Sequence, residues 1–304
     1  MLYTFAMFKT FLDRLIVYAL LVAAIVLAYS TSPLENFARA GDFVGGIFGT
    51  VIAGLSVYLL VETLKHQRSS SEQQSFENRY FELVKLHREN VAEFDLGKHQ
   101  GRKTFISLVR EFQAILQHVS SGGESNTLNE RTKILIAYYT FYYGVGPNSS
   151  RMLSSALEPH LTSEQMEFVR TLIHYFFDKG IRLEMAKEVR LSHGPVDGHQ
   201  SRLGHYYRHL YQTVSYIDQQ EISDEKKRQY VKTIRAQLTN YEQALLLINS
   251  LTPLGEAWEE SNFMRKYRMV RNLPKDFFDK ETELDVLAIF ENDPHYFEWQ
   301  DQAS

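Results

Sequence analysis

A cluster of histidine and arginine residues is the part of the chain best suited to chemistry. Four of the eleven histidines lie in the segment SHGPVDGHQSRLGHYYRH, residues 192–209. A helix that begins near Gly198 would place Arg202, His205 and His209 on one face, because positions i, i+3 and i+7 lie close together at 100° per residue. This His/Arg face is the predicted functional surface.

The first interpretation of this face is RNA cleavage. Arg202 and His209 have the Arg-x6-His spacing that resembles the motif of HEPN ribonucleases, which are all-helical enzymes. In that family the imidazole carries out acid–base work on the RNA 2′-hydroxyl, and the guanidinium supports charge at phosphate. Leu203 departs from the family, which generally has a polar residue there. A metal-independent endoribonuclease is therefore the enzymatic alternative. The main prediction is a protein that is not an enzyme.

Two other interpretations use the same side chains. His205 and His209 could bind a metal together with His199 or a distant carboxylate, but no Glu follows His205 as it does in zincins, and the chain contains no cysteine. We therefore expect no metal and no cofactor. In the remaining interpretation Arg202, Arg208 and the imidazoles bind a phosphate-bearing ligand, or satisfy buried partners between helices.

The composition excludes several classes of protein. The chain has 304 residues, of which 44% are hydrophobic and 23% are charged, and its formal net charge is −4. These values exclude a disordered chain and a polytopic transporter. The absence of cysteine excludes disulfide scaffolds, cysteine-ligated metal sites and thiol nucleophiles.

The N-terminal region contains two long uncharged stretches. Twenty residues without charge separate Arg14 from Glu35, and nineteen separate Asp42 from Glu62. About 20 residues of helix are needed to cross the hydrocarbon core of a membrane. We expect a two-helix transmembrane hairpin in residues 1–64, with spans at about 15–34 and 43–61 joined by a loop at 35–42, rather than a cleaved signal peptide followed by a buried helix.

The residues around these spans predict their orientation and packing. Lysine and arginine flank the hairpin at both ends, which places both termini in the cytoplasm. In the second span Gly46, Thr50 and Gly54 recur every four residues and form a small-residue face. Such a face allows close helix packing, either inside the hairpin or between protomers of a homo-oligomer.

The remainder of the chain is predicted to be an all-α cytoplasmic domain at residues 65–272. A long juxtamembrane helix is expected from Glu62 towards Gly97, since this stretch lacks Pro and Gly. Residues 273–304 form an acidic segment with several aromatic residues, which we expect to dock on the domain. Further helices are expected at about 102–118, 128–143, 163–178, 180–191, 199–218, 224–250 and 254–271. A capping box at Thr162 and an N-cap at Ser223 predict two of the helix starts, and loops are expected at 120–123, 144–148 and 192–198.

Four segments in a fixed order resemble a known family. They are FENRYFELVKLHRENV at 76–91, GHQSRLGHYYRHLYQTVSYI at 198–217, YVKTIRAQLTNYEQALLLINSL at 230–251 and KYRMVRNLP at 266–274. Together with the apolar N-terminal region, they resemble the phage abortive-infection family of the AbiC type. The positions that match its recurrent segments are His87, Arg88, Glu89, Asn90, His199, Gln200, Arg202, His205, Arg208, Arg235, Gln237, Leu238, Asn240, Glu242 and Asn249.

The resemblance implies an antiphage protein in the bacterial inner membrane that senses infection through its cytoplasmic domain. The partners expected are the membrane and a phage-derived trigger protein or phosphate-bearing ligand, with RNA only under the ribonuclease alternative. A structural membrane adaptor for a neighbouring defence protein is a further alternative. The candidate ligand-binding residues are His199, Gln200, Arg202, His205, Arg208, His209, Arg235, Gln237, Asn240 and Glu242, and groups on the helix from Arg235 to Glu242 would serve equally as hydrogen-bonding partners between helices.

Overall fold

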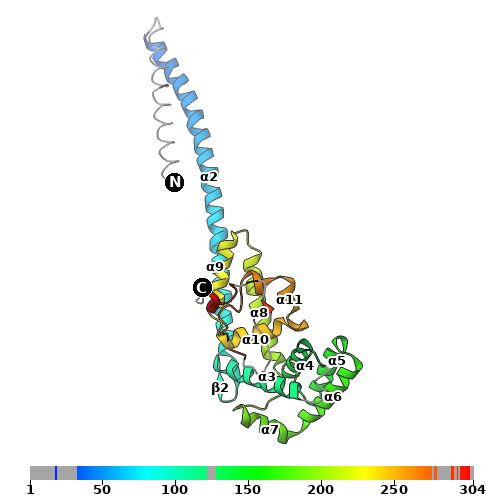
Figure 1. The fold of residues 1–304 in the computed structure, drawn as a ribbon. Coiled ribbons are helices and arrows are strands. Elements are labelled where there is room, and N and C mark those ends of the chain that lie inside the picture. The colour runs from blue at the N-terminus through cyan, green and yellow to red at the C-terminus, as the bar shows by residue number, and fades with distance from the viewer. Residues whose placement is uncertain are drawn as a thin grey trace. The chain divides into compact units, whose positions relative to one another are not determined.

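The N-terminal half of the predicted membrane hairpin lies largely outside the part of the chain that can be described. The computed structural model describes residues 18, 33–121, 128–275, 277–278, 289–290, 293 and 295–301 (Figure 1). Of the first predicted span, 15–34, only Tyr18, Pro33 and Leu34 are among them. That span, and with it the hairpin, stays a prediction.

The second predicted span is part of a helix that is longer than expected. Helix α2 comprises Pro33–Ala92, which is 60 residues. The prediction of a loop between the two spans is wrong for residues 35–42, because they belong to this helix. Their sequence, ENFARAGD, contains no proline, and one glycine costs a helix only about 1 kcal/mol.

Among the described residues, one helix is long and apolar enough to cross a membrane. It is the part of α2 that covers Gly45–Ala92. The most apolar 18-residue window of this part is not buried at all. The second predicted span, 43–61, falls in this region. The chain divides into two compact units, Met1–Asn78 and Arg79–Ser304, which we call unit 1 and unit 2.

In the described part of unit 2, the only strands form one very short hairpin, in which β1 (Asp95–Leu96) pairs antiparallel with β2 (His99–Gln100). In Figure 1, α5, α6 and α7 lie at one end of unit 2, and α9 lies at the other. The longer helices are α3 (Lys103–Ser121), α4 (Glu130–Tyr143), α5 (Ser149–Leu157), α6 (Ser163–Phe177), α7 (Lys179–Glu188), α8 (Gln200–Asp218), α9 (Asp224–Arg235) and α10 (Asn240–Ser250). Shorter pieces are η2 (Glu158–His160), η3 (Pro253–Gly255), α11 (Glu256–Glu260), α12 (Phe263–Lys266) and α14 (Glu298–Asp301).

Two of the predicted helices are interrupted. The predicted helix at 224–250 is two helices, because Thr239 caps a new start at α10. The Thr239 hydroxyl accepts a hydrogen bond from the Glu242 backbone N–H, and the Glu242 carboxylate accepts one from the Thr239 N–H. The predicted helix at 254–271 is replaced by η3, α11 and α12, since Asn262 and Arg268 adopt left-handed backbone conformations.

Other local predictions are confirmed. Thr162 forms the capping box expected at the start of α6, and Ser223 caps α9. The loops expected near residues 144–148 and 192–198 are present, whereas α5 was not predicted. Local capping chemistry therefore identified helix starts correctly, and breaks inside long helical stretches were missed.

The core of unit 2 is formed by α3, α4, α8 and α10. Phe112 of α3, Phe141 of α4, Leu210 of α8 and Leu245 of α10 are all fully buried. Each such side chain contributes about 1.5–3 kcal/mol when it is removed from water. The buried side chains of α3, α4 and α10 therefore hold α8 in place.

A close backbone contact joins the end of α4 to the start of α8. The His199 N–H donates to the Tyr142 carbonyl over 2.8 Å. Gly144 and Gly198 have φ angles of 78° and 88°, and a Cβ atom at Gly198 would lie 2.4 Å from the carbonyl oxygen of Tyr143. Glycine is required at this junction, because no side chain fits between the two backbones.

We predict that Gly198→Ala lowers the free energy of unfolding by about 2–4 kcal/mol, through backbone strain and overpacking. Thermal unfolding of the full chain in detergent measures the effect. The control is Gly41→Ala, where a Cβ atom would meet nothing within 4 Å. Equal melting temperatures for the two variants would contradict the close contact described here.

Candidate functional site

The predicted His/Arg face of α8 does not form one continuous surface. Arg202 and His205 are exposed, His209 is half-buried and His199, immediately before the helix, is buried. Gln200 and Arg208 are exposed as well. The candidate residues therefore belong to several separate environments.

His199 belongs to a buried cluster built around Glu111 of α3. One carboxylate oxygen of Glu111, Oε2, accepts hydrogen bonds from Nε2 of His193 over 2.5 Å and from Nε2 of His199 over 2.9 Å. The other oxygen accepts one from the backbone N–H of Val196 over 2.8 Å. We call Glu111, His193 and His199, with the Val196 N–H, the Glu111 clamp, because one carboxylate holds the loop that leads into α8.

The electrostatics of the clamp explain how a buried carboxylate stays ionised. Burial raises the pKa of Glu111, but the Coulomb interaction with His199 and the hydrogen bonds from both imidazoles outweigh it and lower the pKa to about 2. An ionised carboxylate only accepts hydrogen bonds, so both Nε2 atoms must carry a hydrogen. The tautomers of His193 and His199 follow from this requirement.

The clamp also holds a strained backbone. Val196 is fully buried and has a φ angle of 63°, a conformation that β-branched residues rarely adopt. Its N–H is the donor to Glu111, and its carbonyl accepts from the N–H of Val145 over 2.8 Å. The Glu111 hydrogen bond is therefore one of the contacts that offset the strain in this loop.

Glu111, His193 and His199 are also residue types that bind metal ions, and one ligand atom from each lies within 4.8 Å of the others. A metal-bound histidine normally donates its second ring N–H to an acceptor. In the part of the chain that the structure describes, Nδ1 of His193 and Nδ1 of His199 are buried without a hydrogen-bond partner. The cluster thus fits a hydrogen-bonded clamp better than a metal centre.

Glu111 was not predicted from the sequence. It lies 82 residues from His193, so no local motif joins the two. The available signal was a single acid among apolar residues on the buried face of the predicted helix at 102–118, where Leu108, Phe112 and Ile115 surround it. A lone acid on an apolar face needs a buried partner, and the histidines were the obvious candidates.

His209 lies against a second buried histidine, His87 of α2. The two ring centroids are 6.2 Å apart and the ring planes are nearly parallel, at 19°. All four ring nitrogens are buried and have no hydrogen-bond partner among the described residues. Burial, with His209 and Arg102 as further causes, lowers the pKa of His87 to about 4. Burial also lowers the pKa of His209, with His205 contributing.

This arrangement bears on the ribonuclease alternative. Acid–base work on a bound substrate requires an imidazole nitrogen within hydrogen-bonding reach of it. Both nitrogens of His209 are buried in this structure, while Arg202 is exposed. The Arg202 and His209 pair therefore does not present a joint catalytic surface in this conformation.

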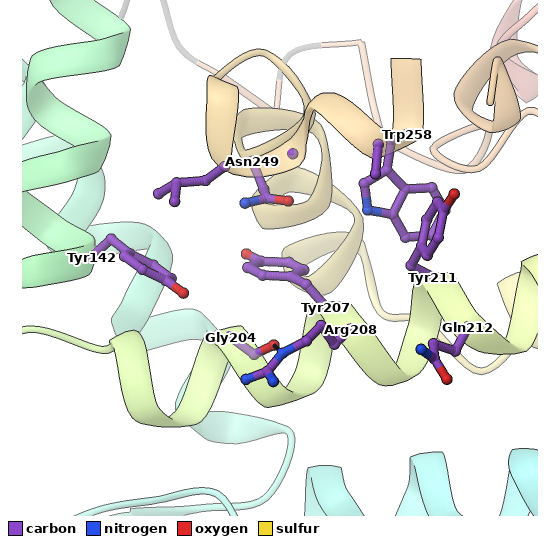
Figure 2. Close-up of a pocket in the computed structure, with 11 residues that line it drawn as sticks. Tyr142, Gly204, Tyr207, Arg208, Tyr211, Gln212, Asn249 and Trp258 are labelled. Atoms are coloured by element: carbon purple, nitrogen blue, oxygen red, sulfur yellow. Dashed lines mark hydrogen bonds between the residues drawn. The ribbon is translucent and has the colours of Figure 1, made fainter. Parts of the chain in front are cut away.

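Arg208 lines a pocket of about 290 Å³ between α4, α8, α10 and α11 (Figure 2). In Figure 2, Arg208 and Gln212 lie on α8 along one side of the pocket, and Asn249 and Trp258 lie on the other. Tyr142 comes from α4. We call this the aromatic pocket, and it is lined by Tyr142, Gly204, Tyr207, Arg208, Tyr211, Gln212, Asn249, Leu254, Gly255, Ala257 and Trp258.

Hydrogen bonds fix the walls of the aromatic pocket. The Tyr207 hydroxyl donates to the Leu245 carbonyl over 3.1 Å, and the Asn249 amide donates to the Tyr138 hydroxyl over 3.1 Å. The Asn249 amide oxygen, Oδ1, is buried and has no partner among the described residues. The Arg208 guanidinium donates to the Gly204 carbonyl of its own helix. The pocket thus offers aromatic faces and one cation to a ligand.

The candidates around the α9–α10 junction have mainly structural contacts. Glu242 is buried and accepts hydrogen bonds from Thr239 and from the Tyr206 hydroxyl. Burial is the main cause of its raised pKa. The Gln237 carbonyl accepts from Arg102 over 3.0 Å, and Asn240 is the first residue of α10. Arg235 lies apart from the others, in a basic pocket described below.

The small-residue face is exposed in unit 1. Gly46, Thr50 and Gly54 lie on α2, and the Thr50 hydroxyl donates to the Gly46 carbonyl over 2.7 Å. A Cβ atom at Gly46 or Gly54 would meet nothing within 4 Å. Close packing through this face stays a prediction.

We predict that Glu111→Gln lowers the free energy of unfolding by about 2–4 kcal/mol at pH 7, because it breaks a buried charged network. The folded-state pKa of about 2 is below the ordinary value of 4.5. The carboxylate therefore stabilises the fold above about pH 4.5, and this stabilisation is lost as the pH falls towards 2. Urea unfolding at pH 7 and pH 3 measures this loss of stability.

The matched control for that experiment is Glu130→Gln, an exposed acid in the first turn of α4. The wild type and the control should lose stability between pH 7 and pH 3 more steeply than Glu111→Gln does. Parallel pH dependence of all three proteins would be incompatible with an ionised, clamped Glu111.

Arg202→Ala and His209→Ala should separate a structural role from a catalytic one. Arg202 is exposed, so we expect its loss to change stability by less than about 0.5 kcal/mol, whereas loss of the packed His209 ring should cost about 1–3 kcal/mol. Urea unfolding and protection against phage are measured for both variants. Loss of protection and of RNA cleavage in both variants, with the fold intact, would instead support the ribonuclease alternative.

The sequence from α8 to α12 matches the model of a known protein family. The model of the family described as "Putative phage abortive infection protein" matches residues 198–278, which contain α8, α9, α10, α11 and α12. No curated protein and no solved structure matches the chain. The segment at 76–91, on which the resemblance also rested, lies outside the match. This match supports the resemblance to the phage abortive-infection family that the sequence motifs indicated.

Proposed function

We propose that this protein is a membrane-anchored abortive-infection protein of the bacterial inner membrane, whose cytoplasmic unit 2 senses phage infection. The observation that carries the proposal is the row of exposed apolar side chains on α2. Ile52, Val57, Tyr58 and Leu60 are each more than half exposed. A contiguous apolar surface of this kind is typical of a segment that contacts lipid or another protein.

The family match supports the antiphage part of the proposal. It covers α8 to α12, which contain every lining residue of the aromatic pocket except Tyr142 and most of the residues singled out by the motifs. The trigger would be a phage-derived protein or a small ligand that binds unit 2. A trigger acts only if it binds two states of the protein with different affinity, so the response requires a second conformation of unit 2.

Membrane anchoring predicts the behaviour of a double variant, Val51→Lys/Ile52→Lys, at the centre of the expected span. Each lysine at the centre of a membrane helix costs about 2.5–3.5 kcal/mol. We expect the wild-type chain to stay with the membrane fraction after an alkaline carbonate wash, and the double variant to lose both this resistance and protection against phage.

The matched control is Ser70→Lys/Ser71→Lys, which adds the same charge to an exposed polar part of the same helix. It should fractionate and protect as the wild type does. A wild-type chain that protects cells but appears in the soluble fraction would overturn the anchoring.

Measurements on cells that express the protein distinguish the proposed function from its alternatives. Protection by this gene alone would exclude a purely structural adaptor for a neighbouring gene product. Membrane potential and RNA integrity are then followed after phage addition. Depolarisation with intact RNA fits a membrane effector, whereas RNA loss at normal potential fits the ribonuclease alternative.

A further inference from the structure

A second pocket of unit 2 is lined almost entirely by cations. Its volume is about 610 Å³, and it lies between α9 and the segment from α12 to Arg271. We call it the basic pocket. Its lining residues are Arg228, Lys232, Arg235, Arg265, Lys266, Tyr267, Arg268, Arg271 and Asp293.

The positive charge of this pocket is only partly neutralised by the protein. Its lining contains seven Lys or Arg residues and one Asp. Asp293 pairs with Arg268 over 3.1 Å, and Asp218, outside the lining, pairs with Lys266 over 2.5 Å. Arg228 and Lys232 form no ion pair with any described residue. Among the described residues, seven cations thus line one cavity together with a single acid, and an anionic ligand would reduce the repulsion between them.

Backbone carbonyls hold the central guanidinium in place. Arg235 of α9 donates to the carbonyl oxygens of Tyr267 and Arg268, over 3.1 Å in each case. Burial, with the nearby Arg271 and Arg268 as further causes, lowers the pKa of Arg235. Its hydrogen-bond partners are therefore neutral carbonyl groups, which orient the guanidinium without neutralising it, while the Coulomb interaction with Glu298 opposes the effect of the two neighbouring cations on its pKa.

The opposite wall is held in a similar way. Arg265 donates to the Ile289 carbonyl over 2.8 Å, and its guanidinium lies over the Phe290 ring at 5.4 Å from the centroid. Arg271 donates to the His295 carbonyl over 3.1 Å. Arg268 has a φ angle of 48°, in the left-handed region. The cations are thus positioned before any ligand binds, which reduces the entropy lost on binding.

We propose that the basic pocket binds a small anion that carries two or more phosphate groups. Arginine guanidinium groups match phosphate oxygens in a bidentate geometry, and lysine adds charge at the rim. A cavity of about 610 Å³ is the size of an ordinary small-molecule site and holds a ligand as large as a nucleotide. The phosphates could belong to a soluble polyphosphate or to a lipid headgroup.

The basic pocket goes beyond the proposed function, because its charge and geometry indicate a ligand site whether or not the protein acts against phage or lies in a membrane. Of the residues predicted to bind a ligand, Arg235 alone lines the pocket. All of its lining residues except Asp293 lie within the family match at 198–278. Binding to the purified protein tests the site without any phage assay.

The experiment is calorimetric titration of the full chain in a nonionic detergent with inorganic pyrophosphate and with ATP. The main variant is Arg228→Gln/Lys232→Gln, because both side chains are exposed and neither forms a hydrogen bond with another described residue that the fold would lose. Arg235→Gln is the second variant, and its folding is checked by thermal unfolding. The matched control is Arg110→Gln/Arg170→Gln, which removes two exposed charges outside the pocket.

We expect pyrophosphate or ATP to bind the wild type and the control equally, and to bind either pocket variant at least tenfold more weakly. To identify the source of the phosphates, the same proteins are mixed with lipid nanodiscs that contain cardiolipin or only phosphatidylcholine. Binding of cardiolipin alone, weakened by the pocket variants and not by the control, assigns the site to a lipid headgroup.

Three results would overturn the proposal. The first is no binding of pyrophosphate, ATP or cardiolipin by the wild type, and the second is equal weakening by the pocket and control variants. The third is variant-sensitive binding of a 20-nucleotide single-stranded RNA that pyrophosphate does not displace, which would assign this surface to nucleic acid instead.

Discussion

The hydrogen bonds that the ionised carboxylate of Glu111 accepts are the interaction on which the arrangement of unit 2 depends. This carboxylate is fully buried in α3, yet it holds both histidines and the Val196 N–H of a loop more than 80 residues away. Leaving an uncompensated charge at such a position is strongly destabilising, so carboxylate and imidazoles stabilise the fold only together. The clamp therefore links the α3–α4 part of the core to the start of α8.

The position of α8 in turn decides which side chains meet. Because His199 is held at the clamp, Leu203, Tyr206 and Leu210 face the core. Arg208 then lines the aromatic pocket, and His209 packs against His87. A single predicted face is thus divided among a structural cluster, a ligand-sized pocket and a buried histidine pair. The basic pocket is a separate feature, formed where α9 meets the segment after α12.

Most of the helices could be predicted from local patterns, and most of the site could not. The N-caps at Thr162 and Ser223 involve residues only three positions apart, so the sequence contains all that is needed to predict them. The break before Asn240 was missed, because a long apolar pattern continues on both sides of Thr239. The exposed loop expected at residues 35–42 is helical, since polar residues alone do not end a helix.

The amino-acid sequence by itself determined an all-α chain with an apolar N-terminal region, no thiol chemistry and a resemblance to the abortive-infection family. These features depend on composition and on neighbours within one or two helical turns. Only the tertiary structure decided that Glu111 meets His199, that Asn249 meets Tyr138 and that Arg235 meets the backbone at Arg268. Such contacts join residues 33 to 111 positions apart, and their partners are selected by packing rather than by local sequence.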